Sequence, residues 1–97
     1  EPRTAAEKGR ASVLDGIPEQ LSALARANKI ISRVRSRRVG VDLPDDPLTA
    51  EQVGAEILAL AARAEAVGID PDQAVRDAVR GLERQVVAAE TRQPESA

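Results

Sequence analysis

The 97-residue sequence has no cysteine, histidine, methionine or aromatic residue, and each absence excludes a class of structure or chemistry. Without cysteine the chain can form no disulfide, thiolate nucleophile or cysteine-based zinc site, and without histidine it lacks the commonest general base and nitrogen ligand. Any chemistry must therefore use carboxylates, lysine or arginine. Because leucine and isoleucine are its largest apolar side chains, we expect a thin core that gains stability from burial against a partner.

The sequence also lacks a signal peptide and any apolar run that approaches membrane-spanning length. It therefore predicts a cytoplasmic protein with no membrane partner. The formal net charge of −2 and the isoelectric point near 5.2 argue against a dedicated nucleic-acid binder. Because no methionine is present and the first residue is Glu1, we expect a fragment of a longer protein.

The chain divides into an arm, a helical region and a tail. Residues 1–16 show weak periodicity and end in an Asp-Gly turn, which predicts an arm or linker, with a short helix near residues 3–12 as the alternative. Residues 17–93 are predicted to form one helical domain, and residues 94–97 a disordered tail. No segment has the pattern of a strand, so the predicted fold class is all-α, a bundle of three principal helices.

The first principal helix is predicted to start at Pro18, which suits a first turn, and to run to about Val39 before Gly40 stops it. One side of this segment is apolar and the other is basic. The apolar arc comprises Ile17, Leu21, Leu24 and Ile31, with Ala27, Ile30 and Val34 less central, and Asn28 falls within it. An asparagine in such an arc fixes packing register or, alternatively, binds a ligand.

Two further helices follow a turn-rich connection that contains Gly40, Pro44 and Pro47. Thr49 and Gln52 form a capping-box signal for the second helix, which is predicted to end at Gly68. Its apolar stripe is Val53, Ile57, Leu60, Ala61, Ala64 and Val67.

The third helix opens at the sequence DPDQ, where Asp70 can cap, Pro71 can take the first position and Gln73 can complete a capping box. Apolar side chains recur along this segment with a period of 3.6 residues, which predicts one helix face that packs on the core. The stripe is Ala74, Val75, Ala78, Val79, Leu82, Val86 and Ala89.

Acidic residues near the second helix are candidate metal ligands. Glu51 and Glu56 lie five residues apart, which turns them by about 140° from each other, whereas carboxylates that share a metal usually stand three or four apart. The alternative is that Glu51 interacts with the positive helix end and the loop acids only solvate the loop. The loop acids are Asp42, Asp45 and Asp46.

A basic face on the first helix is the second candidate site. Arg26, Lys29, Arg33 and Arg37 line the side opposite the apolar arc, in a basic segment that also contains Arg35 and Arg38 and has no acid between them. Such a face can meet phosphates or the acidic surface of a partner, or it can simply be solvated. No aromatic residue is present to stack on a base, and the acidic charge balance ranks a nucleic-acid role last.

Three segments together resemble a known family: KGRASVLDGIPEQLSALARANKI, then RVGVDLPDD, then EQVGAEILALAARAEAVGIDPDQAVRDAVRGLER. Over roughly residues 8–90 the chain resembles the C-terminal half of MazG-type nucleoside triphosphate pyrophosphohydrolases. The resemblance implies a bacterial protein with a MazG-like helical bundle. In that family an E-x-x-E pair and an E-x-x-D pair on successive helices hold Mg²⁺ against the triphosphate.

Several positions depart from the family pattern. By the resemblance, Gln52 stands where the glutamate ligand would be and Ala55 where the aspartate would be. The turn passes directly into the second helix, which leaves no room for the first acidic pair. On the closing helix, Val79 and Gly81 replace the Asn and Lys that tend to reach the nucleotide. The resemblance therefore implies a degenerate domain with no metal or cofactor site of its own, Mg²⁺ belonging to the parent enzyme.

The sequence thus predicts a non-catalytic MazG-like C-terminal domain that dimerises or packs against the catalytic domain of the same protein. In the alternative, the basic face contributes cations to a Mg²⁺-dependent site, completed by another domain, that converts NTP to NMP and pyrophosphate. The residues of that face are Arg26, Lys29, Arg33 and Arg37.

Overall fold

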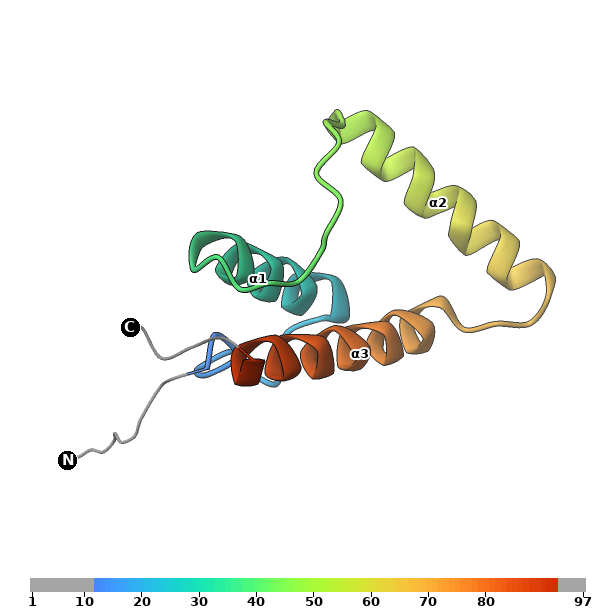
Figure 1. Cartoon of the computed structure of the whole chain (residues 1–97). Coiled ribbons are helices and arrows are strands. Elements are labelled where there is room, and N and C mark those ends of the chain that lie inside the picture. The colour runs from blue at the N-terminus through green and yellow to red at the C-terminus, as the bar shows by residue number, and fades with distance from the viewer. Residues whose placement is uncertain (1–11, 93–97) are drawn as a thin grey trace.

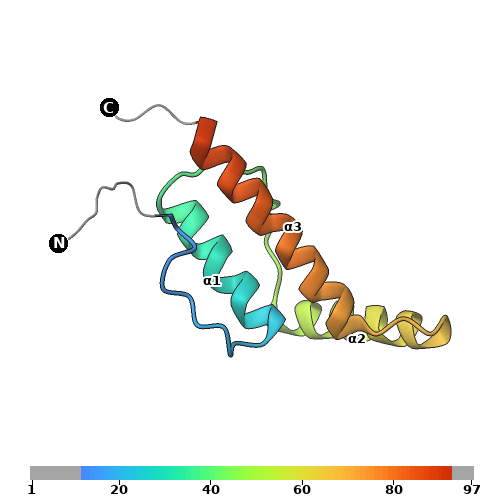
Figure 2. The ribbon, with the colours of Figure 1, turned by 90° about the horizontal axis from the view of Figure 1, so that it is seen from below.

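Two amphipathic helices pack side by side, and a third helix projects away from them. The computed structural model describes residues 12–92, and in this range it contains three helices and no strand. The helices are α1 (Ala23–Ser36), α2 (Ala50–Ala66) and α3 (Pro71–Arg92). α1 and α3 run alongside each other in the same direction, while α2 diverges from them (Figures 1 and 2). The all-α prediction is confirmed.

The core lies between α1, α3 and the segments that flank α1. Ile30 of α1 and Val86 of α3 are fully buried and form its centre. Partly buried Val41 and Leu43 of the connection after α1 also pack against it. None of the buried side chains among the described residues is larger than isoleucine, as the composition predicts. The buried set is Val13, Ile17, Ile30, Val34, Val39, Val79, Val86 and Ala89.

The segment before α1 is held to the helix pair by charged side chains on both of its sides. Glu90 of α3 accepts hydrogen bonds from the Ser12 hydroxyl and the Val13 N–H, both at 2.9 Å. Arg33 of α1 donates to the backbone carbonyls of Val13, at 2.9 Å, and Asp15. These contacts place Val13 in the core. They fall in the predicted arm, whose first eleven residues, including most of the alternative short helix, lie outside the described part.

α1 starts at Ala23 and not at Pro18, so the predicted start was wrong. Ser22 is the N-cap, and its hydroxyl accepts the N–H of Ala25 at 3.2 Å. A serine cap satisfies a free N–H of the first turn, which proline cannot do. The non-helical approach also lets Ile17 reach the core, where it is 7% exposed.

The end of α1 also differs from the prediction, because Arg38 and not Gly40 makes the turn. Arg38 has φ 55°, in the left-handed region that normally favours glycine. The turn lets the Val39 N–H donate to the Val34 carbonyl at 3.0 Å, and it buries the Val39 side chain. Burial of Val39 helps to offset the unfavourable backbone conformation of Arg38.

The ends of α2 follow the sequence signals closely. Thr49 and Gln52 form the predicted capping box: the Thr49 hydroxyl accepts the Gln52 N–H at 3.1 Å, and the Gln52 side chain accepts the Thr49 N–H at 2.9 Å. After α2, Gly68 has φ 75°, and the Ile69 N–H donates to the Ala64 carbonyl at 2.9 Å. The capping box and the glycine stop are both confirmed.

The cap of α3 is confirmed in part. The Asp70 carboxylate accepts the N–H of Asp72 at 3.0 Å and of Gln73 at 3.4 Å, and the helix begins at Pro71. The Gln73 side chain does not return to the cap, because it donates to Asp77 at 3.0 Å. The capping box predicted here is therefore only half formed.

α2 packs on little else in the described part of the chain, where none of its residues is buried. Of its predicted apolar stripe, only Ala61 and Ala64 are half-buried, and the larger members are exposed. The radius of gyration is 16.2 Å, whereas a compact domain of this size has about 12 Å. The projecting α2 contributes to this excess (Figure 1). No helix in residues 12–92 combines the length and apolar character needed to cross a bilayer.

Candidate functional site

The acidic candidates do not converge. Glu51 and Glu56 are exposed on α2, and the loop acids Asp42, Asp45 and Asp46 are exposed as well. Within residues 12–92, no three acidic side chains come close enough to hold a metal ion. Glu51 lies in the first turn of α2, where a carboxylate interacts favourably with the helix dipole.

Gln52 and Ala55, which the resemblance aligns with family ligands, have side chains that do not bind Mg²⁺ strongly. Gln52 uses its side-chain oxygen in the capping box of α2. Ala55 is exposed and carries no donor atom. On α3, Val79 is buried in the core. Because Mg²⁺ is usually held by carboxylates together with substrate phosphates, these side chains provide no cation site.

The predicted basic face is divided in the structure. The half-buried Arg26 donates to Glu83 of α3, with 2.7 Å between Nε and Oε2, and to the Pro18 carbonyl at 3.3 Å. Half-buried Arg33 holds the segment before α1. Lys29 and Arg37 are exposed. Two of the four cations therefore have structural partners, and the other two are the ones open to a ligand or another chain.

Asn28 is exposed on α1, so its predicted place in the apolar arc was wrong. The arc is centred on Ile30 and Val34, because α3 covers that side of α1. Leu24, predicted to be central, is 54% exposed. The helix is thus rotated relative to the predicted arc.

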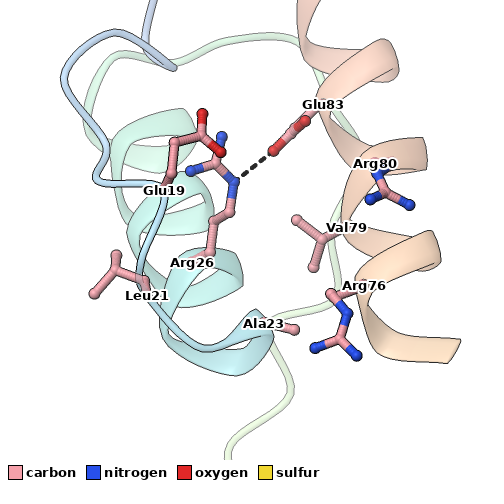
Figure 3. Close-up of a pocket in the computed structure, with 8 residues that line it drawn as sticks. All are labelled: Glu19, Leu21, Ala23, Arg26, Arg76, Val79, Arg80 and Glu83. Carbon is pink, nitrogen blue, oxygen red and sulfur yellow. Dashed lines mark hydrogen bonds and ion pairs between the residues drawn. The ribbon is translucent and has the colours of Figure 1, made fainter. Parts of the chain in front are cut away.

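A cleft of about 320 Å³ lies between the start of α1 and the first half of α3 (Figure 3). Its walls are more charged than apolar. Arg26 and Glu83 face each other across the cleft, and their side chains are 20% and 25% exposed. The lining residues are Glu19, Leu21, Ala23, Arg26, Arg76, Val79, Arg80 and Glu83.

The arginines of this cleft have partners on neighbouring residues. Arg80 pairs with Asp77 at 3.2 Å, and Arg76 donates to the Gln73 side chain at 3.4 Å. With Arg26 bound to Glu83, each of the three arginines of the cleft is engaged with a neighbouring side chain, two of them with an acid. The arrangement links α1 to α3 by an ion pair, and it lacks the carboxylate cluster that a metal-assisted hydrolysis would need.

Sequence reasoning missed Glu83 and Glu90 of α3. Both acids lie within the apolar stripe of α3, because Val79, Glu83, Val86 and Glu90 follow one another at intervals of four, three and four residues. An acid in a core-facing stripe signals a donor on the element that packs against it. Arg26 of α1 is that donor for Glu83, and the segment before α1 provides the hydroxyl and N–H donors for Glu90. That spacing could have located both acids.

Comparison with known proteins gives a relative without an established activity. An uncharacterized 26.1 kDa protein in the blaB 3′ region of Streptomyces cacaoi is 40% identical over 89 residues, which cover 91% of this chain and 36% of the relative. This chain thus spans about a third of the length of the curated relative. No family model matches the sequence, and no solved structure matches it.

Proposed function

We propose that this chain is a non-catalytic, MazG-like C-terminal domain of a bacterial, cytoplasmic nucleoside triphosphate pyrophosphohydrolase. Its role is assembly: it pairs with a second copy or packs against the catalytic domain of the same protein. The order of the VLDGIP, RVGVDLPDD and GIDPDQAVRDAVRGLER motifs supports the family assignment. Catalysis and Mg²⁺ binding belong to the rest of the parent enzyme.

The observation that carries this proposal is the uncovered apolar surface of α2. Val53, Ile57, Leu60 and Val67, on or next to this helix, are 41–70% exposed. Each large aliphatic side chain removed from water contributes about 1.5–3 kcal/mol. Contiguous apolar surface of this kind usually marks an interaction site.

The dispersal of the carboxylates supports the loss of catalysis. Glu51 and Glu56 point in different directions from α2, and the loop acids lie outside the helix. A divalent cation held against a triphosphate needs several convergent oxygens, and no histidine or cysteine is present to replace them.

When the purified chain is incubated with Mg²⁺ and each common NTP, pyrophosphate should be released no faster than in buffer without the chain. The physical reason is that the chain has no convergent acids to place the cation beside the phosphates. A coupled pyrophosphate assay measures this, with an active MazG-type enzyme as the positive control. Release that scales with chain concentration and stops on addition of EDTA would show that the domain is catalytic.

A second candidate function is favoured by the exposure of Lys29 and Arg37, which leaves two cations of α1 open to a triphosphate bound by another domain. Arg26 and Arg33 are poor probes of this idea, because their removal would also disturb packing. In the parent enzyme, a Lys29→Ala/Arg37→Ala variant should keep the wild-type kcat and KM for NTP if the domain acts only in assembly. A KM raised about tenfold or more would instead assign these cations to the substrate.

A further inference from the structure

The exposed apolar residues of α2 follow a coiled-coil spacing. Successive members are separated alternately by three and four residues, which places them along one seam of a helix. A seam of this kind packs against another helix in successive layers. We call these residues the α2 seam: Ala50, Val53, Ile57, Leu60, Ala64 and Val67.

The large members of the α2 seam are uncovered in the described part of the chain. Val53 and Ile57 are 41% and 43% exposed, and Leu60 and Val67 are 59% and 70% exposed. Figure 1 shows that α2 is joined to the rest of the molecule by the connections at its two ends. A second helix is needed to cover this seam.

The α2 seam complements itself when a second copy is placed antiparallel. With the two-fold axis level with the middle of the helix, Ile57 meets Leu60 of the other copy at the centre. In the next two layers on either side, a valine of one copy meets an alanine of the other, which fills space evenly. The layers are Ile57 with Leu60, Val53 with Ala64, Ala50 with Val67 and, just beyond the helix, exposed Leu48 with exposed Ile69, each pair drawn from opposite copies.

Charge complementarity selects the same arrangement. Glu56 and Arg63 flank the α2 seam on one side, seven residues apart, and both are exposed. An antiparallel pair brings this side of one helix against the same side of the other, so that Glu56 faces Arg63 of the second copy at two equivalent places. In a parallel pair, Glu56 and Arg63 would instead lie beside the uncharged Ala61 and Gly68 of the second copy. The Ala64 side chains of the two copies would also face each other, which fills less space.

We propose that α2 is a dimerisation helix that packs antiparallel against α2 of a second copy through the α2 seam. The partner is a second copy because the helix contains both halves of each apolar layer and of each ion pair. This inference rests on the proposed assembly function and commits it to one partner.

The test uses sedimentation equilibrium of the whole chain over a range of concentrations. The wild-type chain should dimerise, and Leu60→Glu should raise the dimer Kd at least about 100-fold, because each dimer would bury two unpaired carboxylates in its central layers. Leu58→Glu is the matched control, since Leu58 is 71% exposed on α2 but lies outside the α2 seam. This control should leave the Kd within about threefold of wild type.

A charge exchange tests the orientation. Arg63→Glu alone and Glu56→Arg alone should each raise the Kd about tenfold, because each replaces two attractions by two like-charge contacts. The double variant Glu56→Arg/Arg63→Glu should return the Kd to near the wild-type value. Circular dichroism of each variant at high concentration reports whether the total helix content is retained.

The outcomes separate this inference from the proposed function. A wild-type dimer that is insensitive to Leu60→Glu, or single charge variants that the double variant does not rescue, would overturn the antiparallel α2 pairing. A monomeric wild-type chain that binds the separately purified catalytic part of its parent would overturn this inference but keep the assembly function. A monomer with no such affinity would overturn both.

Discussion

Ile30→Ala should lower the free energy of unfolding by about 2–5 kcal/mol. Ile30 is completely buried between α1 and α3 and, with Val86, forms the centre of a core without aromatic side chains. A chain with so few large core residues has little to replace the lost contacts, and small domains have total stabilities near the lower end of about 5–15 kcal/mol. The variant should therefore be largely unfolded at 37 °C.

Urea unfolding followed by far-ultraviolet circular dichroism measures this effect, at one fixed protein concentration because association alters apparent stability. Leu24→Ala is the matched control on the same helix, and its 54% exposure predicts a change of less than about 1 kcal/mol. If the two variants lowered the free energy of unfolding equally, Ile30 would not be buried as the structure describes.

Glu90→Ala should destabilise the chain by about 2–3 kcal/mol and release the segment before α1. The carboxylate accepts two hydrogen bonds from this segment, and bonds to a charged group contribute about 1.5–3 kcal/mol when they are partly buried. Their loss leaves the Val13 N–H without its acceptor while the Val13 side chain is only 2% exposed. Urea unfolding gives the free energy, and amide hydrogen exchange at Val13 reports the local release.

Glu90→Gln is the matched variant that separates geometry from charge. A glutamine can accept the Val13 N–H and donate to the Ser12 hydroxyl, so both contacts can form without the charge. Glu90→Gln should lower the free energy of unfolding by about 1 kcal/mol or less, and the amide exchange of Val13 should stay close to that of the wild-type chain. Fast Val13 exchange in the wild-type chain would contradict the anchoring role, as would an alanine variant with unchanged protection.

The helix termini predicted from the sequence are correct where a polar cap has no competitor. The Thr49–Gln52 box and the Gly68 stop involve only neighbouring residues, so local sequence determines them. The limits of α1 depend instead on tertiary packing. Burial of Ile17 and Val39 favours non-helical backbone at residues that local preference assigns to the helix.

The candidate site could be predicted less well, because it depends on which helices meet. The basic face of α1 was visible in the sequence, but its division was not, since Arg26 acquires a partner only when α3 lies alongside. The same limit applies to the apolar stripe of α2. Periodicity identified its members, yet it cannot distinguish a face buried within one chain from a face that another chain covers.

The separation of α2 from the α1–α3 pair has a thermodynamic consequence. A 17-residue helix with little tertiary contact is only marginally stable in water. Its ends are well capped, but caps contribute about 1 kcal/mol each and cannot replace a packed face. If α2 pairs with a second copy as proposed, its helical order is linked to that association by mass action, and dilution would melt α2 while α1 and α3 stay paired. In such a chain, association completes the folding reaction.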